Sequence, residues 1–123
     1  MAKPPAEQLL FSLWHIIWMS NWDEDYFNEE VQAYLKIEET GQGEFQFGYV
    51  QGQMDCRVTT DPETSSVKFT WEGVDAADGT PCSGRGWAVV KKGELRGKIF
   101  FHLGDDSKFV ARRPELKTAR KKR

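Results

Sequence analysis

Apolar and polar residues alternate along most of this chain, in short segments separated by turn-forming residues. The clearest segment is 31–38, which is apolar at every odd position. A period of two is typical of antiparallel strands with one face buried and the other in water. The same pattern predicts strands over residues 13–19, 44–49, 54–58, 67–72, 84–90, 95–102 and 108–112.

Short links rich in Gly, Asp and Lys join most of these segments, and they suit tight turns. Links this short exclude parallel pairing, which needs a long crossover. The sequence therefore predicts an all-β fold, an eight-stranded antiparallel up-and-down barrel, with a β-sandwich as the alternative. Aromatic and β-branched side chains favour a strand over a helix at 13–19. One short helix is expected after this first strand, capped by Asn21 with Glu24 three residues later.

Successive turns of such a meander lie at opposite ends of the barrel. The two longest links, 20–30 and 73–83, therefore share one end, which we call the top. The loop carboxylates expected at this end are Asp23, Glu24, Asp25, Glu29, Glu30, Asp75, Asp78, Asp105 and Asp106. Such a concentration of negative charge would attract cations or a basic partner.

The alternation also predicts what lines the barrel interior. Trp18, Tyr49 and Trp71 belong to the apolar phase of their strands and are expected to face inward near the top. Small residues fall at facing positions on two later strands, namely Gly84, Gly86, Ala88 and Gly97. They either leave volume for a ligand or make way for bulky side chains opposite, and the sequence leaves both options open.

The length of 123 residues is that of one domain, and the net charge of −2 conceals a split. Residues 112–123 carry seven cations and one carboxylate, a charge of +6, whereas the rest of the chain carries −8. We expect a single barrel domain over residues 1–113 and a basic, flexible tail over 114–123. The most apolar run, 9–19, is too short for a membrane span and unlike a secretion signal, so a cytoplasmic location is expected.

The two cysteines, Cys56 and Cys82, are expected to be reduced thiols in that compartment. Neither has the spacing of a metal site, and residues 75–79 lack the pattern of an EF-hand loop, so no cofactor is expected. The one metal option left open is a loose divalent-cation site formed by Glu72, Asp75, Asp78 and Asp105.

The candidate ligand-binding residues are Trp18, Trp22, Tyr49, Trp71, Glu72, His102, Asp105 and Asp106. The leading interpretation is a non-enzymatic small barrel that binds a small ligand or a protein partner at this acidic, Trp-rich open end. One alternative is a hydrolase or metal-assisted enzyme, in which His102 is the acid–base group and a carboxylate assists it. The carboxylates considered for that role are Glu72, Asp105 and Asp106. Another alternative is a structural or regulatory interaction module with a filled core.

Charge also bounds the partners. A small apolar or cationic ligand suits the acidic mouth, and a second copy of the chain could reach it with the basic tail. Nucleic acid is not favoured, because an acidic body repels phosphates. No membrane contact is expected.

Five segments together resemble a group of small, uncharacterised bacterial proteins: 21–26, 54–58, 69–73, 84–88 and 99–107. The resemblance covers Trp14 to Arg112. It supplies no activity and no catalytic residues that could be transferred to this chain. In architecture, an eight-stranded meander with Trp in its first strand is similar to lipocalins, fatty-acid-binding proteins and avidin. The Gly-x-Trp signature of lipocalins is not intact, since Ser12 stands where its Gly would precede Trp14. Similarity of fold does not by itself imply a shared function.

Overall fold

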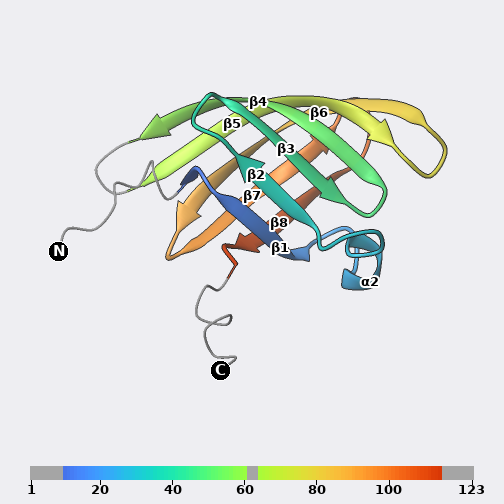
Figure 1. Cartoon of the computed structure of the whole chain (residues 1–123), viewed down its shortest axis with the longest axis horizontal. Helices are drawn as coiled ribbons and strands as arrows, with labels where there is room; N and C mark the ends of the chain where they lie inside the picture. The colour runs from blue at the N-terminus through green and yellow to red at the C-terminus, as the bar shows by residue number, and fades with distance from the viewer. Residues whose placement is uncertain (1–9, 61–63, 115–123) are drawn as a thin grey trace.

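The strands close into one antiparallel barrel in which each strand pairs with its neighbours in sequence and β1 pairs with β8 (Figure 1). This computed structural model describes residues 10–60 and 64–114. The predicted all-β barrel is confirmed, and the sandwich alternative is wrong because the sheet has no open edge. The architecture is compatible with a calycin-like barrel. The predicted basic tail lies almost wholly outside the described residues.

The bounds of the elements follow the predicted order. They are β1 (Leu13–Met19), α2 (Glu24–Phe27), β2 (Tyr34–Ile37), β3 (Gln42–Phe47), β4 (Val50–Thr60), β5 (Ser65–Asp75), β6 (Thr80–Lys91), β7 (Glu94–Phe101) and β8 (Asp106–Arg112). The first segment is a strand, as predicted. Within the described part of the chain, no helix is long and apolar enough to cross a membrane.

The expected long loop at 73–83 is wrong. The β5–β6 ladder continues to the pair Asp75 and Thr80, so these residues form a long hairpin that projects at one end of the barrel in Figure 1. The hairpin turns at Ala76–Gly79, where Gly79 adopts a positive φ of 78° that glycine accepts without strain.

The turn between β3 and β4 also differs from the prediction. It lies at Gly48 and Tyr49, not between the predicted strands 44–49 and 54–58, because Gly48 supplies the left-handed conformation with φ of 58°. Gly52, which marked the expected turn, is a strand residue whose missing side chain makes room for the ring of Phe45. Tyr49 therefore lies in a turn and does not line the interior as expected.

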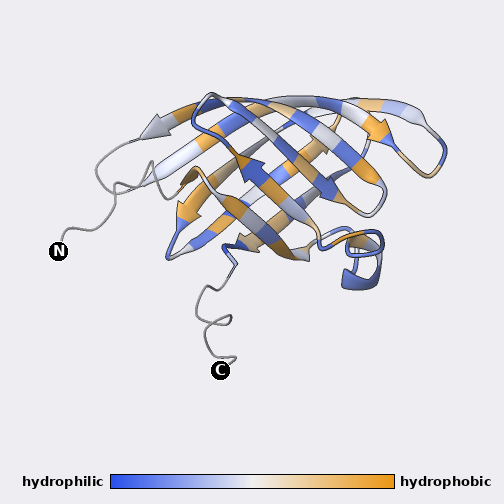
Figure 2. Ribbon diagram, viewed as in Figure 1, coloured by the Kyte–Doolittle hydropathy of each residue, from blue (hydrophilic) through white to orange (hydrophobic). Residues whose placement is uncertain are grey.

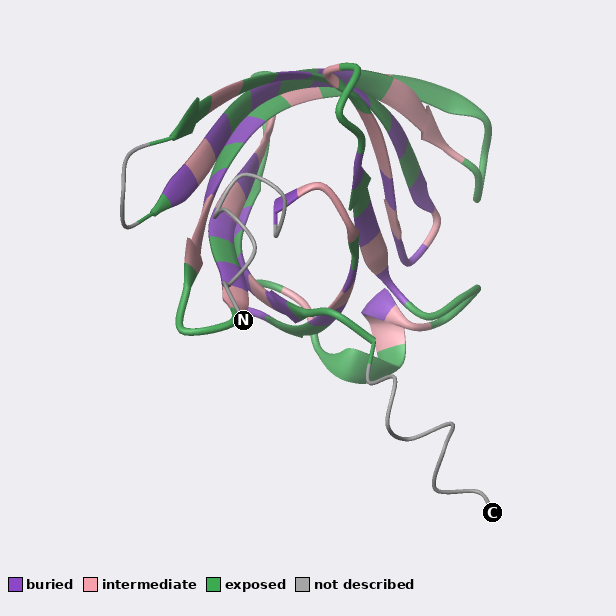
Figure 3. Cartoon of the chain, turned by 60° about the vertical axis from the view of Figure 1, so that its left-hand side comes forward, coloured by how far each residue is buried: buried purple, intermediate pink, exposed green. Residues whose placement is uncertain are grey.

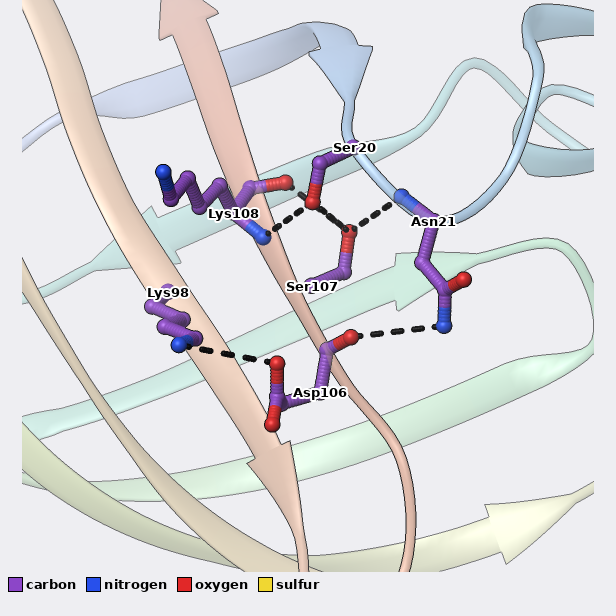
Figure 4. Close-up of polar contacts among 6 residues, drawn as sticks. All are labelled: Ser20, Asn21, Lys98, Asp106, Ser107 and Lys108. Carbon is purple, nitrogen blue, oxygen red and sulfur yellow. Dashed lines mark hydrogen bonds and ion pairs between the residues drawn. The ribbon is translucent and has the colours of Figure 1, made fainter.

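A β-bulge in β1 overturns the expected orientation of Trp18. The register with β8 shifts between Ile16 and Trp18, so two consecutive side chains face outward. Ile17 is 40% exposed and Trp18 is 48% exposed, while Met19 is buried again. Two hydrogen bonds join β1 and β8 beyond the bulge. The Lys108 amide donates to Ser20 Oγ at 2.9 Å (Figure 4). The Ser20 amide donates to the Lys108 carbonyl at 3.0 Å.

Bulky side chains fill the barrel. Buried and exposed residues alternate along the strands, as hydropathy does (Figures 2 and 3). Twenty-one hydrophobic residues of the described chain form a core with exposed fractions of 0 to 6%. The hydrophobic residues packed against this core and only partly buried are Phe11, Trp22, Tyr26, Val58, Cys82, Val90 and Phe101. A cavity able to hold solvent would leave accessible area on the side chains around it, so the low exposure of the core side chains indicates that side chains fill the space between them. Of the small residues, Gly86 makes way for a ring, since a β-carbon there would collide with the ring of Phe69. Gly84 and Gly97 instead permit close approach of the Phe100 and Trp87 carbonyl oxygens.

The two ends of the barrel are covered as well. At the end opposite the top, the Trp14 indole Nε1 donates to the Leu10 carbonyl at 3.0 Å, and both residues are fully buried. At the top, the short helix α2 buries Phe27. Its N-cap is Asp23, whose carboxylate accepts from the Tyr26 amide at 3.1 Å, so the expected cap at Asn21 is wrong.

Candidate functional site

The sequence-predicted mouth residues divide into three groups. Trp71 is in the core, 3% exposed, and Trp22 is half-buried above it. Trp18 lies on the outer wall and Tyr49 in the β3–β4 turn. The exposed polar members are Glu72, His102, Asp105 and Asp106.

Trp22 and Trp71 meet through one aromatic cluster at the top. The ring centroids of Trp22 and Phe47 are 5.1 Å apart, and those of Trp71 and Phe101 are also 5.1 Å apart. Trp22 contacts Phe101 at 6.1 Å, which links the two pairs. Most ring faces are therefore used in packing. Trp18 and Trp22 also line an open hollow of about 460 Å³ beside α2.

The acid–base arrangement considered at the β7–β8 turn is not assembled. Ser107 is buried, its hydroxyl accepts from the Asn21 amide at 3.1 Å, and it lies 2.9 Å from the Lys108 carbonyl, to which it donates (Figure 4). Asp106 pairs with Lys98 Nζ at 3.6 Å. The His102 side chain has no hydrogen bond or ion pair with any residue that the structure describes. No group of three or more metal-ligating side chains occurs across 10–60 and 64–114.

Negative charge at the top acts across several loops. The charge of Glu29 is the main cause that raises the pKa of the Tyr49 phenol, followed by desolvation and by Glu30. Burial raises the pKa of Tyr26, and the charge of Asp75 adds to that rise. The link after β1, the β3–β4 turn and the β5–β6 hairpin therefore share one acidic field.

The outer wall of β4–β8 carries a site that sequence reasoning missed. Three rows of outward-facing residues cross these five strands in register. The rows are Arg57, Lys68, Trp87, Lys98 and Lys108; Asp55, Thr70, Arg85, Phe100 and Asp106; and Thr59, Ser66, Val89, Arg96 and Val110. We call these fifteen positions the cationic band. They include six cations and two carboxylates, a formal charge of +4 in a chain whose net charge is −2.

Part of the cationic band is hollowed into a groove of about 440 Å³. Its lining residues are Asp55, Arg57, Lys68, Phe69, Thr70, Arg85, Gly86, Trp87 and Phe100. Trp87 is 44% exposed there. The Arg85 guanidinium lies 4.4 Å from the Phe100 ring centroid, and Lys98 Nζ lies 5.0 Å from the same centroid. The groove therefore combines positive charge with aromatic surface.

Three of the six cations are paired with carboxylates within the described part of the protein and three are not. The shortest of these pairs joins Arg96 to Glu94 at 2.7 Å. Arg57 is 3.8 Å from Asp55, but both side chains are at least two-thirds exposed, and such pairs are weak. The Lys98–Asp106 pair is also long and partly exposed. Lys68, Arg85 and Lys108 form no ion pair with any other described residue. The charges of Lys68, Arg85 and Lys108 are therefore available to an external anion.

Comparisons with protein-family models, with curated proteins and with solved structures found no match for this chain. The cationic band and the acidic top are therefore the observations on which function is argued.

Proposed function

We propose that the protein is a non-enzymatic binding module that holds an anionic partner against the cationic band. The observation that carries this proposal is the row of four cations and Trp87 across five neighbouring strands. The filled interior supports a partner on the outer wall over a ligand inside the barrel. The aromatic cluster at the top supports the same choice, because its rings pack mainly on one another.

Like charges face each other directly in this row. Arg57 is the cross-strand partner of Lys68, and Lys98 is the cross-strand partner of Lys108. Directly opposed like charges destabilise a sheet. An anion bound between them would relieve this repulsion. The repulsion in the free protein therefore makes the free energy of anion binding more favourable.

The spacing suits an extended partner with several charges. Adjacent strands lie about 4.8 Å apart, so the row presents cations in short steps across the wall. A partner with one charge would neutralise only one or two of them. The cationic band therefore favours a polyanion.

Titration calorimetry with inorganic polyphosphate tests this proposal, since polyphosphate offers charge without aromatic groups. The full chain is expected to bind it at low salt and to lose affinity as salt rises. The double variant Lys68→Glu with Lys98→Glu should bind at least about tenfold more weakly and with a shallower salt dependence.

Lys36→Glu is the control for a single charge reversal elsewhere and is compared with Lys68→Glu alone, because Lys36 is an exposed cation on β2, outside the cationic band. Its polyphosphate affinity should stay within about twofold of the unmodified chain, since one distant charge is largely screened. Equal losses in Lys68→Glu and this control would contradict the proposal, as would an absence of polyphosphate binding at low salt.

A further inference from the structure

We infer that the anionic partner is a single-stranded nucleic acid. This inference rests on the function proposed above and specifies the class of polyanion. Charge alone does not explain why the groove exposes an indole and a stacked guanidinium. Single strands are bound by positively charged surfaces that also carry planar groups on which bases stack.

Trp87 provides the first stacking platform. It lies at the centre of the first row, between Lys68 on β5 and Lys98 on β7. Its indole is 44% exposed and makes no ring contact with any other described side chain. A base stacked on this ring would leave its phosphates beside a cation on either side.

Arg85 provides the second platform. Its guanidinium lies over the Phe100 ring, and the side chain is exposed to solvent. Bases stack on guanidinium planes as well as on aromatic rings. Arg85 is two residues before Trp87 on β6, so both side chains project from the same face of one strand, about 7 Å apart along it. The two platforms therefore suit neighbouring bases of one strand.

The net negative charge of residues 1–111 would repel phosphates if it were spread evenly, but positive and negative charges lie on different parts of the barrel. The loop carboxylates gather at the top, while the outward positions of β4–β8 carry a formal charge of +4. A strand on the wall would meet cations and would be repelled only from the top.

Other polyanions fit the groove less well. The bases of a duplex are paired and stacked on one another, so none of them is free to stack on Trp87. A membrane surface favours protruding apolar groups, whereas this surface is hollowed. The acidic top of a second copy is complementary in charge, but a top-to-wall contact is heterologous and would build rings or open chains of molecules. It would also leave the exposed ring of Trp87 without a planar partner on which to stack.

Fluorescence anisotropy with a labelled oligothymidylate of about twelve nucleotides tests this inference on the full chain. The competitors are the matching duplex, polyphosphate of equal charge, poly-glutamate and anionic vesicles. The single strand should bind at least about tenfold more tightly than any of these. Trp87→Ala should weaken the oligonucleotide about tenfold and leave polyphosphate affinity unchanged, because only stacking is lost.

Trp18→Ala is the control, since Trp18 is an indole of similar exposure that pairs with Val110 at the edge of the cationic band but does not line the groove. This variant should change neither affinity. If Trp87→Ala has no effect and polyphosphate competes equally at matched charge, the nucleic-acid inference fails while the proposed polyanion function stands. Tighter binding of poly-glutamate or vesicles would likewise overturn the inference. If neither polyphosphate nor the oligonucleotide binds, both proposals fail.

Discussion

The phenyl ring of Phe69 lies directly over Gly86, its partner on the neighbouring strand, so that a β-carbon on Gly86 would collide with the ring. The same β-carbon would lie 2.7 Å from the Lys98 carbonyl oxygen. The glycine therefore provides the space that a large core side chain occupies. This relationship is a local reason why the barrel interior is filled at this point.

Gly86→Ala is expected to destabilise the protein by about 1–3 kcal/mol, since overpacking forces the ring or the backbone to move. Urea unfolding measures the effect. Gly104→Ala is the matched control, because its added β-carbon would come no closer than 3.3 Å to another atom, and Gly104 has no positive φ. A Gly86→Ala variant as stable as this control would contradict a filled interior at Phe69.

Tyr34 and Glu44 form a polar pair on the wall opposite the cationic band. The Tyr34 hydroxyl donates to Glu44 Oε2 at 2.7 Å. Desolvation, followed by the hydrogen bond to Glu44, raises the pKa of Tyr34 from 10.0 to about 12. The folded state therefore favours the neutral phenol. The resulting stability is fully present below pH 10 and is lost as pH rises toward 12.

Tyr34→Phe should cost about 1 kcal/mol near pH 8, where it removes a partly exposed hydrogen bond. The difference in unfolding free energy between the variant and the unmodified chain should shrink between pH 10 and 12. Urea unfolding at pH 8, 10 and 11 gives this difference directly. A difference that stays constant over the three pH values would show that Tyr34 titrates normally in the folded protein.

The barrel could be predicted from the sequence because two local signals agree. A period of two in hydropathy specifies strands with one buried face, and short links specify antiparallel neighbours. The first strand, 13–19, matches β1 at both ends for this reason. Trp18 was misplaced because the bulge beside it depends on the pairing of β1 with β8, about ninety residues away.

Glycine explains the errors at the turns. Gly52 and Gly73 both fall in links that the hydropathy pattern predicts between strands, but they are paired to each other in β4 and β5. A β-carbon on Gly73 would collide with the Gln51 carbonyl oxygen. A glycine that permits close backbone approach and a glycine that permits a turn look the same in sequence. Only the tertiary pairing separates the two roles.

The cationic band could not be predicted for a related reason. Its cations are spread over residues 57–108 and alternate with core residues, so no basic run marks them. The formal charge of the body is −8, which conceals a positive wall beside a negative end. Strand register brings Lys68, Lys98 and Lys108 into one row, and register is fixed by the closed barrel.

The outer-wall site is tested most directly by proton–nitrogen NMR of the full chain during titration with inorganic polyphosphate. The indole N–H signals report each Trp separately, and those of Trp14 and Trp71 are hydrogen-bonded in the core. Shifts are expected at the amides of Lys68, Arg85 and Lys108 and at the Trp87 indole, with the Trp14 and Trp71 indoles unchanged. Shifts confined to the top, around Trp22 and Tyr49, or appearing at the Trp14 indole would contradict binding on the cationic band.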